Sequence, residues 1–135
     1  MLISGVIVSL VVSWSMASAP TTQSDRPLVF SRVCNIEPGQ EAEAEALAEE
    51  MVALVNARYP GAELTASTGR WMNGFQSLAV PVNQVRFTEQ HPDPESREAF
   101  TAILLGDDDF DVIQRQMAEV IDFSRCTETQ FRARP

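Results

Sequence analysis

The sequence predicts an α+β fold of the ferredoxin-like split βαβ type, an antiparallel sheet with helices on one face. Segments typical of strands and segments of helical periodicity follow one another in the order β-α-β-β-α-β. The chain has 135 residues, of which 44% are hydrophobic and 21% charged. These values are ordinary for a globular protein of this size. We therefore expect one folded domain.

The first strand and the first helix are separated by a change of composition. Residues 28–36 read LVFSRVCNI, a mixture of β-branched, aromatic and polar side chains that is typical of a strand. Residues 37–39 (EPG) interrupt this pattern. Residues 40–59 are then rich in Ala, Glu, Leu and Met, with apolar side chains at helical spacing. Pro60-Gly61 ends the expected helix.

A hairpin is expected next, because Asn73-Gly74 separates two segments of strand length. Residues 63–71 and 75–82 flank this pair, whose residue types suit the positive φ angles of a tight turn. Pro81 cannot donate a ladder hydrogen bond. The second strand is therefore either an edge strand at that point or restarts over residues 84–89.

Two helices and a final strand complete the pattern. Residues 93–95 (DPE) combine an N-cap, a first-turn proline and a carboxylate that the helix dipole favours. This helix ends at Gly106, Asp107 starts a second one, and residues 120–131 form the last strand. The expected apolar sides are Ala99, Phe100, Ile103 and Leu104 in the first helix and Phe110, Ile113 and Met117 in the second.

Composition disfavours several classes of function. The net charge is -9 and the basic residues form no cluster, so nucleic acid is not an expected partner. All ten basic residues are arginine, so the chain has no lysine for Schiff-base chemistry. One histidine and two cysteines are too few for an ordinary zinc or haem site within one chain. We expect no metal and no cofactor.

The N-terminal segment predicts export to the periplasm or secretion. Residues 2–14 (LISGVIVSLVVSW) are uncharged and apolar, and residues 17–19 (ASA) supply a small-residue cleavage pattern. We expect a signal peptide over residues 1–19, a disordered linker over 20–26 and the folded domain over 27–135, with no membrane attachment after cleavage. Because no Lys or Arg precedes the apolar run, an uncleaved membrane anchor is the alternative.

Three local features carry a resemblance to a known superfamily. They are EPGQ at residues 37–40, TGRW at residues 68–71 and LGDDDF at residues 105–110. With these features the sequence resembles the dimeric α+β barrel superfamily, in particular its antibiotic biosynthesis monooxygenase-like and NIPSNAP-like domains, over roughly residues 27–132. The resemblance implies a homodimer with sheets packed face to face and a pocket between sheet and helices. It also implies diverse activities, including cofactor-independent oxygenation and isomerisation.

Cys34 and Cys126 are expected to form a disulfide. In the split βαβ arrangement the first and last strands are antiparallel neighbours, so one cross-link fixes the register of the pair. An oxidising compartment would preserve the bond, and two buried free thiols are the alternative. The residue pairs that follow from this register are Arg32 with Glu128, Phe30 with Gln130 and Ile36 with Ser124.

Candidate ligand contacts lie at the expected hairpin. Arg70, Trp71 and Asn73 offer a cation, an amphipathic ring and an amide, a combination that suits an anionic or aromatic ligand. Alternatively, Trp71 is a packing residue and Asn73 serves only the turn. His91 is the simplest candidate for a general base at neutral pH. Its position before a proline, however, favours a solvated loop histidine.

Two functions are consistent with the sequence. The first is a homodimer that binds a small, partly apolar molecule and acts as a monooxygenase- or isomerase-like enzyme; the second is a non-catalytic exported domain for dimerisation or protein interaction. A cavity reached by polar groups favours the first, and one filled by Phe75, Leu78 and Phe100 favours the second. Dimerisation is also expected because Leu28 and Phe30 are assigned to the face of the sheet that the helices leave bare.

Overall fold

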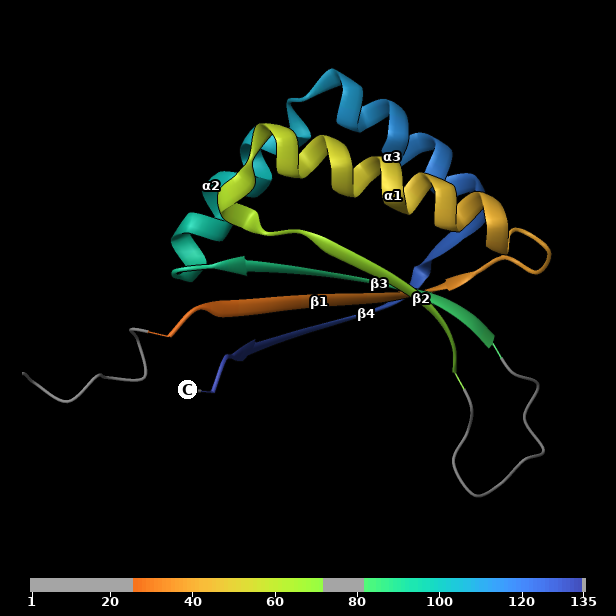
Figure 1. Ribbon diagram of the computed structural model, residues 1–135, viewed down its shortest axis with the longest axis horizontal. Helices are drawn as coiled ribbons and strands as arrows, with labels where there is room; N and C mark the ends of the chain where they lie inside the picture. The colour runs from red at the N-terminus through yellow and green to blue at the C-terminus, as the bar shows by residue number, and fades with distance from the viewer. Residues whose placement is uncertain (1–25, 72–81, 135) are drawn as a thin grey trace, which may run out of the picture.

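A computed structural model describes residues 26–71 and 82–134 of the chain (Figure 1). Their α+β class is confirmed. The expected turn at Asn73-Gly74, strand residues 75–81 and the N-terminal segment through residue 25 lie outside the described residues. The elements are β1 (Leu28–Ile36), α1 (Glu41–Arg58), the 3₁₀ helix η2 (Pro60–Ala62), β2 (Thr65–Trp71), β3 (Val82–His91), α2 (Pro94–Leu105), α3 (Asp108–Val120) and β4 (Ile121–Arg132).

The four strands form one antiparallel sheet in the order β2-β3-β1-β4. In Figure 1 the three α-helices lie on one side of this sheet, and no described element covers the other side. This two-layer arrangement is the expected split βαβ fold, with β1 and β3 at the centre. In the part of the chain that is described, no helix combines the length and apolarity needed to cross a membrane.

The core lies between the sheet and helices α1 and α3. Val85 of β3, Val55 of α1 and Met117 of α3 have no exposed surface. The buried residues of α1 recur every three or four positions, as expected for the inner face of an amphipathic helix. The apolar side predicted for α3 is also buried, at Phe110, Ile113 and Met117.

Helix α2 covers the sheet less completely than its sequence suggests. Of its expected apolar side, Phe100 and Leu104 pack against the core. Ile103 is 58% exposed, and Ala99 is exposed as well. No residue of α2 is fully buried. The helix therefore does not seal the layer between itself and the sheet, and a cavity occupies this space.

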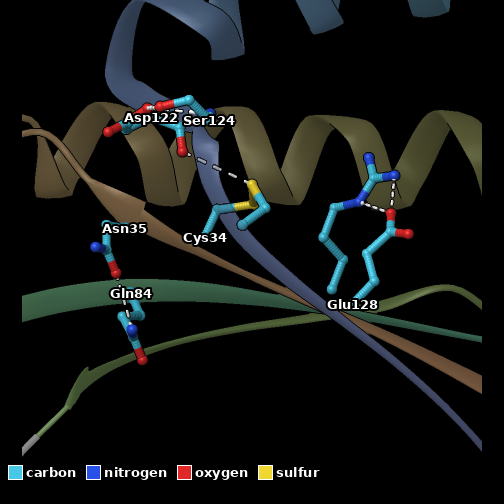
Figure 2. Close-up of a disulfide and its surroundings, with 8 residues drawn as sticks. Cys34, Asn35, Gln84, Asp122, Ser124 and Glu128 are labelled. Carbon is cyan, nitrogen blue, oxygen red and sulfur yellow. Dashed lines mark hydrogen bonds and ion pairs between the residues drawn. A yellow bond between two sulfur atoms is a disulfide. The ribbon is translucent and has the colours of Figure 1, made fainter.

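The disulfide between Cys34 and Cys126 is present and joins β1 to β4 (Figure 2). The predicted partners of Phe30 and Arg32 are confirmed, since they face Gln130 and Glu128. The predicted partner of Ile36 is wrong, because this residue faces Ile121 and not Ser124.

A β-bulge between Val33 and Asn35 causes this change of register. The extra residues of β4 are arranged by a local hydrogen-bonded turn, in which the Asp122 carboxylate accepts from the Ser124 amide at 3.0 Å and from the Ser124 hydroxyl at 2.5 Å. Such side-chain bonds to nearby backbone compete with the regular ladder. The hydrogen bond from the Ser124 side chain also lowers the pKa of Asp122.

The expectation that Leu28 and Phe30 lie on the bare face is wrong. Side chains alternate along a strand, and Cys34 belongs to the core beneath the helices. Leu28 lies six positions before Cys34 and Phe30 lies four positions before it. Because both intervals are even, these two side chains point toward the helices as well. The bare face, named here the uncovered face, carries the intervening residues of β1, which are Val29, Ser31, Val33 and Asn35.

Candidate ligand-binding site

A cavity of about 140 Å³ lies between the sheet and the three helices. Engineered protein cavities of similar size bind benzene. Its polar lining residues are Arg32, Glu89, Arg97, Thr101, Gln114 and Glu128. The apolar wall consists of Phe30, Met51, Leu64, Phe87, Phe100, Leu104, Leu105, Phe110, Met117 and Phe123.

The sheet forms a floor in which apolar and charged side chains alternate. Phe30 and Arg32 are two residues apart on β1, and both point toward the helices. On β3, Glu89 faces Phe30 and Phe87 faces Arg32. Each aromatic ring therefore lies beside a charged group, and all four residues line the cavity.

The first charged group at the cavity is an ion pair between α2 and β3. Arg97 Nε donates to Glu89 Oε1 at 3.1 Å. The guanidinium carbon of Arg97 also lies 3.5 Å from the centre of the Phe30 ring, in a cation–π contact. The Arg97 and Glu89 side chains are 25% and 17% exposed. Partial burial makes this pair more favourable than a fully solvated one.

The second charged group joins β1 to β4. Arg32 donates to Glu128 Oε1 through Nε, at 2.6 Å, and through Nη2. Figure 2 shows Glu128 of this pair to one side of the disulfide. Arg32 lies two residues before Cys34 on β1, and Glu128 lies two residues after Cys126 on β4. The two side chains are 43% and 45% exposed, so the pair lies at the solvent side of the cavity.

His91 is buried, contrary to the expectation of a solvated loop residue. It is the last residue of β3, faces Leu28 and is 5% exposed. Strand pairing extends to the residue before Pro92, and alternation turns the His91 ring toward the helices. The ring lies 5.0 Å from that of Phe100 between centroids. Its Nε2 lies 3.4 Å from Glu89 Oε1 and has no hydrogen-bond partner among the described residues.

The hairpin candidates lie apart from this cavity. Arg70 faces Asn83 near the start of β3, eight residues before His91. Phe87, the β3 residue of the cavity wall that is nearest to Asn83 in sequence, lies four positions further along, which at 3.3 Å per residue is roughly 13 Å. Arg70 is exposed, Trp71 ends β2 opposite Val82, and Asn73 lies outside the described residues. A ligand site at Arg70, Trp71 and Asn73 stays a prediction.

Sequence reasoning missed Arg97 and Glu89 as site residues. It placed Glu89 in a strand and Arg97 in a helix, but it gave no relation between them. The alternation of side chains along β3 could have indicated Glu89, because it places this side chain on the face of the sheet that the helices cover. Among residues 26–71 and 82–134, no three His, Cys, Asp or Glu side chains are grouped closely enough to hold a metal ion.

The fold and the cavity define the chain as a ferredoxin-like α+β domain with a pocket beneath its helices. Solved structures of NIPSNAP family proteins have a similar fold. One from Agrobacterium tumefaciens has a TM-score of 0.59 and 16% identity, over 81% of this chain and 87% of that one. A second from the same organism, of unknown function, has a TM-score of 0.60 and 11% identity, over 81% and 89%.

A third similar structure is a conserved protein of unknown function from Bacteroides thetaiotaomicron, described as a possible oxidoreductase. Its TM-score is 0.51 and its identity 11%, over 81% of this chain and 99% of that one. No protein-family model and no curated protein matches the sequence. The similarity therefore rests on three-dimensional structure: the chain has a ferredoxin-like α+β fold similar to that of these NIPSNAP proteins.

Proposed function

We propose that the cavity beneath the helices binds a small, partly apolar molecule. The observation that carries this proposal is the composition of its wall, in which aromatic rings and two arginine–carboxylate pairs converge on one space. Phe100 lines this space and does not fill it. Ligand sites typically combine a largely apolar wall with a few polar groups that orient the ligand.

The proposal extends to turnover of the bound molecule by proton transfer. Glu89 is the carboxylate at the cavity that lies between two nitrogen-bearing groups, Arg97 Nε at 3.1 Å and His91 Nε2 at 3.4 Å. A carboxylate in this position can accept a proton from a carbon acid and return it, which is the step an isomerase requires. His91, the weak candidate for the general base on sequence grounds, then acts through Glu89 and not directly on the bound molecule. The description of one structural neighbour as a possible oxidoreductase is compatible with enzymatic activity in this fold.

We further propose that the protein works as an exported homodimer. The structural neighbours have a fold that is typically dimeric, and the uncovered face of the sheet offers the surface for a second copy. The disulfide favours an oxidising compartment such as the periplasm. Purified from that compartment, the protein should begin at Pro20, and mass spectrometry of the intact chain checks this directly. A retained residue 1 would support the membrane anchor.

Binding of N-phenyl-1-naphthylamine, a neutral fluorescent probe, tests the cavity. We expect a rise in fluorescence with the exported protein that Thr101→Trp abolishes, because Thr101 lines the cavity and a larger side chain there fills it. Ala102→Trp is the matched control, since Ala102 is exposed and does not line the cavity. No probe binding, or equal loss in both variants with the fold intact, would overturn the proposal.

A further inference from the structure

We propose that the ligand is an amphipathic monocarboxylate and that Arg97 binds its carboxylate group. This inference rests on the proposed function, since it names the chemical class of molecule that the cavity takes. Three features of the described residues carry it: the free hydrogen-bonding capacity of Arg97, the way Glu89 is held, and the apolar wall of the cavity, which includes residues that reach solvent.

Arg97 has hydrogen-bonding capacity that its surroundings do not use. Its Nε donates to Glu89, but its two terminal nitrogens have no hydrogen-bond partner among the described residues. The guanidinium group lies against the Phe30 ring, and the Arg97 side chain as a whole is 25% exposed. A planar guanidinium with free N–H groups at the wall of an apolar cavity matches the geometry of a carboxylate.

Arg32 is the less suitable of the two arginines. Its Nε and Nη2 both donate to the same oxygen of Glu128, so this pair is already joined by two bonds. It is also more exposed than Arg97, which weakens any charge interaction with a ligand. Arg97 shares only one bond with its own carboxylate partner.

Glu89 and Glu128 are the carboxylates that line the cavity, and both would repel an anion. Glu128 is neutralised by Arg32. Glu89 Oε1 accepts a hydrogen bond from Arg97 Nε and lies 3.4 Å from His91 Nε2. His91 Nε2 has no hydrogen-bond partner among the described residues. When Arg97 turns toward a ligand, His91 can donate to Glu89 and keep it in place. The buried nitrogen of His91, which otherwise costs stability, has a role in this arrangement.

The apolar wall of the cavity includes residues that reach solvent, over which the apolar body of the ligand can extend. Phe30, Phe87 and Phe100 are partly buried members of this wall. Leu105 and Phe123 also line the cavity, and they are 64% and 37% exposed. A chain or ring that extends over them would bury their apolar surface. The cavity therefore suits a molecule with a carboxylate at one end and an apolar body longer than the enclosed space.

Octanoate and octanamide test this inference, because they have the same chain and differ in charge. Displacement of N-phenyl-1-naphthylamine measures their affinities. We expect octanoate to bind about tenfold more tightly than octanamide, as expected for a charge-assisted hydrogen bond. Arg97→Met should remove this preference while the neutral probe still binds. Arg97→Lys keeps the positive charge but lacks the planar guanidinium group, so it should retain part of the preference.

The matched control is Arg115→Met, since Arg115 is 71% exposed, pairs with Asp111 and does not line the cavity. It should preserve the preference for octanoate. Equal affinities for acid and amide in the unmodified protein, or an unchanged preference in Arg97→Met, would overturn the assignment of Arg97. If the neutral probe itself does not bind, the proposed function fails as well, so the two failures are distinguishable.

Discussion

Arg58 Nη1 lies 2.5 Å from Asp107 Oδ1 and so joins the last turn of α1 to the N-cap of α3. The Asp107 carboxylate also accepts from the Phe110 amide at 3.1 Å and from the Tyr59 hydroxyl at 3.0 Å. The hydrogen bond from Arg58, followed by that from the Phe110 amide, lowers the pKa of Asp107 to about 2. This one side chain fixes the relative position of two helices that form the roof of the cavity.

Asp107→Ala should destabilise the protein by removing both the helix cap and the ion pair. We expect Tm at pH 7 to fall by about 4–8 °C, the usual effect of a lost N-cap in a domain of this size. Asp107→Asn keeps a capping oxygen and loses the charge, so its Tm should fall less. Asp111→Asn is the control, because it breaks an exposed pair with Arg115 on the same helix. A Tm of Asp107→Ala equal to that of the unmodified protein would contradict this role.

The contribution of the Asp107 charge should depend on pH in a defined direction. Its pKa is lower in the folded protein than the ordinary value of 3.8, so the charged form stabilises the fold. That stabilisation is fully present above about pH 4 and is lost as pH falls toward about 2. The Tm difference between the unmodified protein and Asp107→Asn should therefore be constant from pH 5 to pH 7 and shrink steadily as pH falls from about 4 to about 2. A difference as large at pH 2 as at pH 7 would rule out the charge as its origin.

The helix boundaries were predictable because their causes are local. Asp93 and Asp107 each accept a hydrogen bond from a backbone amide within three residues, so a short stretch of sequence contains the whole interaction. The register of β1 and β4 was predictable for a different reason. One covalent link between Cys34 and Cys126 determines the pairs that follow it, until the turn at Asp122 interrupts the ladder.

The site was not predictable to the same degree, because it depends on how separate elements pack. The Arg97–Glu89 pair requires the orientation of α2 over β3, which no local pattern encodes. His91 was misassigned because Pro92 suggested a loop, whereas pairing with Leu28 extends the strand to its last possible residue. Tertiary contacts thus decided both the position of the cavity and the burial of His91.

Loss of the disulfide should destabilise the protein strongly. The bond closes a loop with a sequence separation of 92 residues, for which the chain-entropy model gives roughly 4 to 5 kcal/mol of stabilisation. Denaturant unfolding of Cys34→Ala combined with Cys126→Ala should show a decrease of this order, and the unmodified chain refolded under reducing conditions should match it. Alkylation without reductant that modifies two cysteines in the exported protein would show that the bond does not form.

Substitutions at His91 should separate its volume from its hydrogen-bonding capacity. His91→Phe keeps a ring against Phe100 and removes the unsatisfied Nε2, so stability should change by less than about 1.5 kcal/mol. His91→Ala leaves a cavity and should cost roughly 2–4 kcal/mol, as for other large buried side chains. Urea unfolding of both variants measures this. If His91→Phe is destabilised as much as His91→Ala, the ring nitrogens must contribute to stability, which would contradict the packing role.

The uncovered face of the sheet should form the homodimer interface. Val29 of β1 faces Phe131 of β4 on this side, and the Phe131 side chain is 51% exposed in the single chain. An apolar pair of this kind is favourable when a second sheet covers it. Light scattering at micromolar concentration should give twice the mass of the processed chain.

Phe131→Arg should convert the dimer to a monomer, because it would place two like charges and two unpaired guanidinium groups within the interface. Ile103→Arg is the matched control, since Ile103 is a similarly exposed apolar residue, 58%, on helix α2 and therefore on the covered side of the sheet. It should remain dimeric. A monomeric mass for the unmodified protein would refute dimerisation itself, and a dimer that survives Phe131→Arg but not Ile103→Arg would move the interface to the helices.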